Sequence, residues 1–173
     1  VQAILDAFEI PHTTKILQLK EGDHKKPEYL AINPAGRVPS LTYGDLTLVE
    51  SGAICLFLAD LFADKMNTPK VGTTDRALLY QWVLFLQTTL EGSAMKGFDP
   101  STKAQGQQEI AQLLPTMASR IKGPFVLGEQ FSVLDVILHC EFSWYKMMDL
   151  FPNGLEPFET HYRAVSARLP KKN

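Results

Sequence analysis

The apolar residues of the first 62 positions change their spacing along the chain, and each spacing predicts a different element. The chain opens as VQAILDAFEI, where Ile4, Leu5 and Phe8 would share one face of a helix. Pro11 ends this pattern, because a proline disfavours helical backbone at the residue before it. Residues 12–19, HTTKILQL, alternate and are rich in β-branched side chains, which predicts a strand.

A hairpin and a helix are predicted next, after a polar connection of residues 20–36 with a short helical turn inside it. The runs VPSLTY and LTLV flank Gly44-Asp45, a pair that suits a two-residue turn of type I′ or II′. An apolar helix follows this hairpin, and Ser51 is a natural N-cap for it.

The second half of the chain is predicted to be helical. Its apolar periodicity indicates four helices, at residues 75–95, 104–122, 132–148 and 155–168. Pro115 should kink or split the second of them. We therefore expect two domains and a polar linker: an α/β domain at residues 1–62, the linker at 63–74 and an all-helical domain at 75–173.

The start of the chain is unusual for such a domain. The first helix begins at the first residue, where nothing caps its free N–H groups. The strand predicted at residues 12–19 also has no earlier strand to pair with through a helical crossover. Both features lead us to expect a preceding segment of about 10–20 residues, a strand and a loop.

Composition narrows the functional classes. Of the 173 residues, 45% are hydrophobic and 21% are charged, with a net charge of −2 and mixed signs along the chain. A nucleic-acid partner is not expected, because such binding needs a concentrated basic face. A membrane partner is not expected either, because the longest apolar runs fall short of the ~18 residues of a span.

The two cysteines and the histidines do not indicate a metal site. Cys55 and Cys140 lie in apolar helical patterns, which favours free buried thiols in a reducing compartment over a disulfide. The spacing of cysteines and histidines is not that of a metal-binding motif.

Residues 128–135, GEQFSVLD, have the pattern of a helix start. Ser132 as N-cap and Asp135 three residues later form a capping box, in which each side chain bonds the other residue's backbone N–H. We interpret this pair as structural rather than catalytic.

Two further stretches have both a structural and a ligand-binding interpretation. Glu50 and Ser51 suit a helix start, but they also suit the ammonium and the carboxylate of an amino-acid head group. Pro39 blunts a strand edge, but Val38 before it keeps a free N–H and C=O for a peptide-like ligand, most easily with a cis peptide bond. The run of residues 23–26, DHKK, reads as a solvated loop or as part of a carboxylate site.

The stretches HKKPEYLAINPAGRVPSL, LTLVESGAICLFLADLF and GEQFSVLDV, in this order, closely resemble the cytosolic glutathione transferase superfamily. The likeness covers nearly the whole chain and is nearest to the phi- and theta-like branches and their bacterial relatives. It implies a thioredoxin-like α/β N-terminal domain, with a mixed sheet that is incomplete here, and an all-α C-terminal domain. It also implies a glutathione site made of His24, Lys25, Arg37, Val38, Pro39, Glu50 and Ser51.

The resemblance gives each of these residues a role. Val38, before a cis Pro39, would pair its backbone with the cysteinyl unit, and Glu50 and Ser51 would hold the γ-glutamyl head. His24, Lys25 and Arg37 would lie near the glycyl carboxylate, although the position of Arg37 is often glutamine or lysine in the family. Ser132 and Asp135 match the family's folding motif.

The resemblance places the catalytic residue upstream of Val1, between the first strand and the first helix. That residue, a serine, tyrosine or cysteine, stabilises the thiolate of glutathione, whose free thiol has a pKa of ~8.5. We therefore assign no catalytic residue within this sequence and do not give that role to Ser51 or Cys55.

The expected function is conjugation of glutathione, the only cofactor expected, to small hydrophobic electrophiles. Glutathione-dependent peroxidase or reductase activity belongs to the same expectation: a catalytic serine or tyrosine would favour conjugation, and a cysteine would favour thiol transfer and reductase chemistry. The alternative is a non-catalytic binding or scaffold protein. The resemblance also implies a cytoplasmic homodimer with a role in detoxification. The electrophile would lie between the domains, near residues that also suit a core: Phe85, Leu86, Thr89, Met95, Trp144 and Met147.

Overall fold

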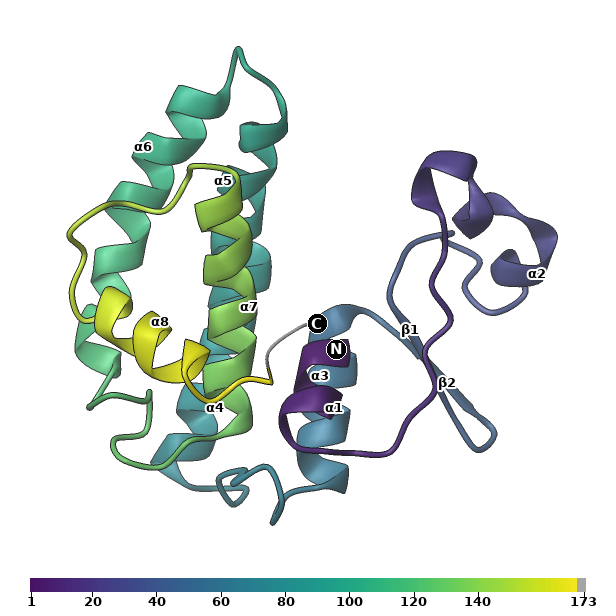
Figure 1. Cartoon of the computed structure of the whole chain (residues 1–173), viewed down its shortest axis with the longest axis horizontal. Helices are drawn as coiled ribbons and strands as arrows, with labels where there is room; N and C mark the ends of the chain where they lie inside the picture. Colours follow the sequence, from purple (N-terminus) through teal and green to yellow (C-terminus); the bar gives the residue numbers. More distant parts are fainter. Residues whose placement is uncertain (171–173) are drawn as a thin grey trace.

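The computed structural model describes residues 1–170 and consists of a small α/β part followed by a helical part (Figure 1). The α/β part contains α1 (Gln2–Ala7), η1 (Leu19–Glu21), η2 (Asp23–Lys25), α2 (Pro27–Leu30), β1 (Ser40–Tyr43), β2 (Leu46–Val49) and α3 (Ser51–Leu61). The helical part contains α4 (Thr74–Leu84), η3 (Phe85–Leu90), α5 (Glu91–Met95), η4 (Lys96–Phe98), α6 (Lys103–Leu113), η5 (Leu114–Arg120), α7 (Val133–Met147) and α8 (Phe158–Ser166). None of the helices formed by the described residues is long and apolar enough to span a membrane.

One buried cluster joins the two parts. Ile4 of α1 and Leu58 of α3 belong to the same cluster as Trp82 of α4 and Phe142 of α7. In Figure 1, α1 and α3 lie between the hairpin on one side and the helical bundle on the other. The hairpin and its turns are therefore held on the bundle through these two helices.

The predicted hairpin is present and its register is regular. β1 and β2 pair antiparallel, with Ser40 opposite Val49 and Tyr43 opposite Leu46. Gly44 has a φ of 57°, whereas the φ of Asp45 is not positive. The turn therefore fits type II′, which needs a positive φ only at its first central residue.

The strand predicted at residues 12–19 is wrong. In residues 1–170 this segment pairs with no strand, and Leu19 already belongs to η1. Ile16, one of its apolar residues, is 75% exposed. Alternation and β-branching favour an extended backbone, but a strand also needs a hydrogen-bonded neighbour, and the described chain offers none.

Two of the predicted long helices change their geometry midway. The helix predicted at residues 75–95 continues through the π-helical η3, between α4 and α5. The helix predicted at 104–122 becomes a 3₁₀ helix at Leu114, next to Pro115. Proline lacks the N–H that an α-helix needs and its ring clashes with the preceding turn, so this split is confirmed.

The predicted linker is fixed to both parts of the structure by hydrogen bonds and by one buried side chain. Met66 is buried and its carbonyl accepts a hydrogen bond from the N–H of Val133, at 3.0 Å. The hydroxyl of Thr68 donates to the carbonyl of Ala59, at 2.8 Å. These bonds join the end of α3 to the start of α7, while the predicted domain boundaries themselves stay a prediction.

Asp135 is the most heavily bonded buried carboxylate in the helical part. Its Oδ2 accepts the N–H and the hydroxyl of Ser132, at 2.8 and 2.9 Å, so the capping box is formed. Its Oδ1 accepts the N–H of Val126 at 2.8 Å and lies 3.0 Å from Nε2 of His161. Asp135 therefore links the start of α7 to the loop before it and to α8.

Replacing Asp135 with alanine should lower the free energy of unfolding by about 3 to 5 kcal/mol, because it leaves buried donors on three residues without an acceptor. Ser132→Ala removes only one hydroxyl of the same box and should cost about 1 kcal/mol. Urea unfolding of both variants measures the difference. Equal losses would show that the bonds to Val126 and His161 add nothing to the capping box.

Candidate functional site

The chain before β1 is fixed by two side chains that hold the same carbonyl. The hydroxyl of Tyr29 and the amide of Asn33 both donate to the carbonyl of Arg37, at 2.6 and 2.7 Å. The peptide bond between Val38 and Pro39 is cis. Tyr29 and Asn33 thus determine where Val38 is presented, although the sequence analysis assigned neither of them a role.

Val38 keeps its backbone free. Its side chain is 46% exposed, and neither its N–H nor its C=O forms a hydrogen bond with the described residues. The register of the hairpin pairs Ser40 with Val49. The ladder ends at this pair, so Val38, two residues before Ser40, and Ser51, two residues after Val49, lie at the same end of the hairpin. One unpaired backbone segment and one helix N-terminus are therefore found at this end.

Glu50 and Ser51 form that helix start, but not with the expected cap. The N-cap is Glu50, which has a φ of 68° and is exposed, whereas Ser51 is the first helical residue. The prediction of Ser51 as N-cap is therefore wrong by one residue, because the chain turns through the positive φ of Glu50. A non-glycine residue in this region costs ~1–3 kcal/mol and is typical of ligand clamps.

The hydroxyl of Ser51 is held from the helical part. Nε2 of Gln87, in the π-helical η3, donates to Oγ of Ser51 at 2.7 Å. Because this oxygen accepts from Gln87, its own hydrogen remains free to donate to an anion. Single-turn π-helices are frequent at functional sites, and here the π-helical turn carries the residue that reaches α3. No sequence pattern indicated Gln87, because it lies 36 residues from Ser51.

The predicted cationic residues gather beside Arg37. Nζ of Lys25 donates to the carbonyl of Gly36, at 3.0 Å. Nδ1 of His24 is buried and has no partner among the described residues. Gly36 has a φ of 57°, and a Cβ there would lie 2.8 Å from the carbonyl oxygen of His24. The small size of Gly36 therefore allows His24 and Lys25 to pack against it. The next residue, Arg37, is exposed.

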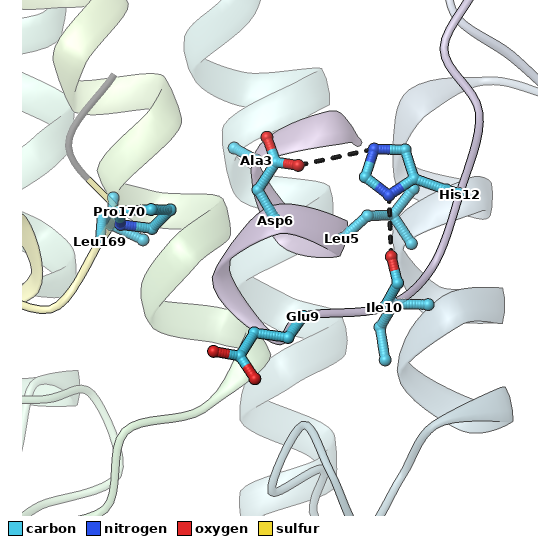
Figure 2. A pocket seen from close by; sticks show the side chains of 8 residues that line it. All are labelled: Ala3, Leu5, Asp6, Glu9, Ile10, His12, Leu169 and Pro170. Atoms are coloured by element: carbon cyan, nitrogen blue, oxygen red, sulfur yellow. Dashed lines mark hydrogen bonds and ion pairs between the residues drawn. The ribbon is translucent and has the colours of Figure 1, made fainter. Parts of the chain in front are cut away.

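A cavity of about 420 Å³ lies elsewhere, lined by Ala3, Leu5, Asp6, Glu9, Ile10, His12, Leu169 and Pro170 (Figure 2). His12 donates through Nδ1 to the carbonyl of Ile10, at 2.8 Å, and its Nε2 lies 3.5 Å from Asp6. None of the seven predicted glutathione residues lines this cavity. Its His12 and Asp6 side chains pair with each other. The free hydrogen-bonding groups at Val38 and α3 therefore identify the candidate site better than the volume of this cavity does.

The comparisons with known proteins agree with the geometry. The family model described as "Glutathione S-transferase, N-terminal domain" matches residues 1–60. A glutathione transferase homologue from Sulfitobacter, solved with bound glutathione, superposes with a TM-score of 0.82 at 25% identity, covering 96% of this chain and 87% of that one. Residues 1–60 thus match the N-terminal domain of this family, and the likeness over the rest of the chain supports the cytosolic glutathione transferase superfamily.

Two curated relatives show how much of the chain this likeness covers. Glutathione S-transferase GstA of Escherichia coli O157:H7 is 27% identical over 161 residues, which is 90% of this chain and 76% of the relative. A glutathione S-transferase of Hyoscyamus muticus is 26% identical over 69% of this chain and 64% of its own length. The predicted fold class of this transferase-like chain, a thioredoxin-like α/β domain with an all-α domain, is confirmed.

The surroundings of Cys55 disfavour a thiolate. It lies in α3, one turn after Ser51, and burial raises the pKa of its thiol. Neither cysteine forms a disulfide, which agrees with the prediction. Residues 1–170 also contain no group of three or more His, Cys, Asp or Glu side chains that could hold a metal ion.

The contact between Gln87 and Ser51 can be tested through Gly52. A Cβ at Gly52 would lie 2.1 Å from Oε1 of Gln87, so Gly52→Ala should displace Gln87 and break its bond to Ser51. The loss of about 1 kcal/mol would offset the gain of about 0.5 to 1 kcal/mol from replacing a helical glycine with alanine. In a Gln87→Ala background only the gain should remain. A double-mutant cycle by urea unfolding measures this, and an additive result would contradict the contact.

Proposed function

We propose that this protein binds glutathione along the edge that runs from His24 through Val38 to Ser51. One observation carries the proposal: Val38 has an unpaired N–H and C=O at the end of the hairpin where α3 begins. The peptide backbone of a γ-linked tripeptide can bond the N–H and C=O of Val38, and its free amino-acid head group can bond the N-terminus of α3. Both kinds of contact recur in peptide and anion recognition.

The head group would be held by opposite charges. The carboxylate of Glu50 is exposed and makes no ion pair with the described residues, so it is available to the ammonium of the γ-glutamyl unit. The N–H groups at the start of α3 and the hydroxyl of Ser51 suit the carboxylate of the same unit. Gln87 would keep that hydroxyl in place.

The glycyl carboxylate would lie at the other end of the edge. Lys25, the exposed Arg37 and the unpartnered Nδ1 of His24 offer positive charge and a hydrogen-bond donor there. The distance between the two ends is bridged by Val38 and Pro39, which the resemblance assigns to the cysteinyl unit. The solved Sulfitobacter relative with bound glutathione supports this choice of ligand.

The proposed reaction is conjugation of the glutathione thiolate to small hydrophobic electrophiles. A thiolate would equally serve a glutathione-dependent peroxidase or reductase. The relatives named glutathione S-transferase support conjugation, and no feature of the described residues favours a non-catalytic scaffold over it. A cytoplasmic location, a role in detoxification and a homodimer belong to the same proposal.

Glutathione should raise the melting temperature by roughly 5 to 10 °C at a concentration of 100 times its Kd, since it binds only the folded state. Glu50→Ala should weaken binding at least tenfold, or about 1.4 kcal/mol, because it leaves the ligand's ammonium unpaired. Glu129→Ala, at an exposed residue of another loop, is the matched control. The same shift in Glu50→Ala and wild type would mean that Glu50 is only a helix-end charge.

Conjugation is tested by the steady-state rate with glutathione and an aryl halide. We expect a rate above the uncatalysed background that saturates with glutathione and that falls in Glu50→Ala. A background rate together with saturable glutathione binding would instead support the scaffold function.

A further inference from the structure

The cavity beside α1 is separate from the proposed glutathione site and has a chemistry of its own (Figure 2). Its volume of about 420 Å³ lies within the range of about 300 to 1,000 Å³ that small-molecule sites occupy. Its walls come from α1, from the residues that follow this helix, and from Leu169 and Pro170 at the other end of the described chain. Residues far apart in sequence thus enclose one space of ligand size.

The way in which α1 ends gives the cavity an apolar floor. Glu9 has a φ of 50°, and its N–H donates to the carbonyl of Asp6 at 3.1 Å. The N–H of Ile10 donates to the carbonyl of Leu5 at 2.8 Å. These two bonds form a Schellman motif, which brings the residue after the left-handed one against the last helical turn. Leu5 and Ile10, each 6% exposed, therefore lie together in the wall of the cavity.

The polar side of the cavity has two acceptors close together. Nδ1 of His12 bonds the carbonyl of Ile10 at 2.8 Å, and this nitrogen carries the hydrogen because a carbonyl only accepts. In the neutral ring Nε2 is then an acceptor, and it lies 3.5 Å from Oδ1 of Asp6, which is also an acceptor. The pair of His12 and Asp6 therefore lacks a hydrogen whenever the imidazole is neutral. A donor nitrogen at the usual distance of about 2.9 Å from both atoms would supply it.

The charge in the cavity favours a cation as that donor. Asp6 and Glu9 both line it, and the exposed carboxylate of Glu9 forms no hydrogen bond or ion pair with residues 1–170. Two neighbouring cations bond other groups: Nζ of Lys65 donates to the carbonyl of Glu9 at 2.9 Å, and the guanidinium of Arg168 lies over two aromatic rings. An anion would meet two carboxylates here, whereas an ammonium group would meet opposite charge.

We infer that this cavity binds an organic cation, a protonated amine with an apolar body. The body lies on Leu5 and Ile10, and the ammonium bonds Asp6 and Nε2 of His12, while Glu9 adds a second negative charge. An ammonium has three hydrogens, which is enough for both acceptors and a water molecule. This site goes beyond the proposed glutathione-dependent function and does not depend on it, because the two sites share no residue.

Three ligands with similar apolar bodies test the inference: 4-phenylbutylamine, the uncharged 4-phenylbutan-1-ol and the anion 4-phenylbutanoate. The titrations are made at pH 8, where imidazole is neutral and a primary alkylamine is still protonated. Calorimetry of the wild-type chain should show the amine binding about three- to tenfold more tightly than the alcohol, because an ion pair near the surface adds this much. The anion should bind more weakly than the alcohol.

The position of the amine is measured with the ¹⁵N-labelled chain. The amine should move the backbone amide signals of Asp6, Glu9 and His12 and leave those of Val38 and Ser51 in place. Equal binding of amine and alcohol would overturn the inference. Movement at Val38 and Ser51 without movement at Asp6 and His12 would also overturn it, because the amine would then occupy the other site.

Variants separate the charge from the shape of the cavity. Asp6→Asn keeps the shape, so the alcohol should bind as before while the preference for the amine falls to about twofold or less. Glu9→Gln should lower the preference by a smaller factor. Glu28→Gln, at an exposed glutamate of α2 beyond the hairpin in Figure 1, is the matched control and should change nothing.

Urea unfolding first establishes that each variant is folded. A full preference for the amine in Asp6→Asn would overturn the inference. If Asp6→Asn binds neither amine nor alcohol, Glu9→Gln decides: a reduced preference supports the cation site, and an unchanged preference overturns it.

Discussion

The candidate site depends on the antiparallel register of one short hairpin. Ser40 pairs with Val49, and this last pair of the ladder brings Val38 and Ser51 to the same end of the hairpin. A shift of the pairing by one residue would turn Val38 to the other face, because side chains alternate along a strand. Tyr29 and Asn33 hold the carbonyl of Arg37 just before this point and so help to fix the register from outside the sheet.

The helical part completes the site rather than only supporting it. Gln87 of η3 reaches the hydroxyl of Ser51, and the segment between the two parts is bonded to both of them. Because one buried cluster includes residues of α1, α3, α4, η3 and α7, the position of η3 relative to α3 is set by packing. The groups at the start of α3 are therefore placed in advance of a ligand.

Local patterns in the sequence were sufficient to predict much of this structure, and contacts between distant residues were not. The hairpin, the split at Pro115 and the capping box of Ser132 and Asp135 follow from turn residues, a missing N–H and a short spacing. The wrong strand at residues 12–19 had the right composition but no neighbour to bond. Gln87 was missed because its role arises only when helices far apart in sequence pack together.

The central claim is that Val38 and Ser51 bind the same ligand molecule. The most direct measurement is a titration of the ¹⁵N-labelled chain with glutathione, followed through the backbone amide signals. The account predicts that the signals of Val38 and Ser51 move together with one binding constant, while those of Asp6 and His12, beside the other cavity, stay in place. Movement of Asp6 and His12 with unchanged signals of Val38 and Ser51 would contradict it.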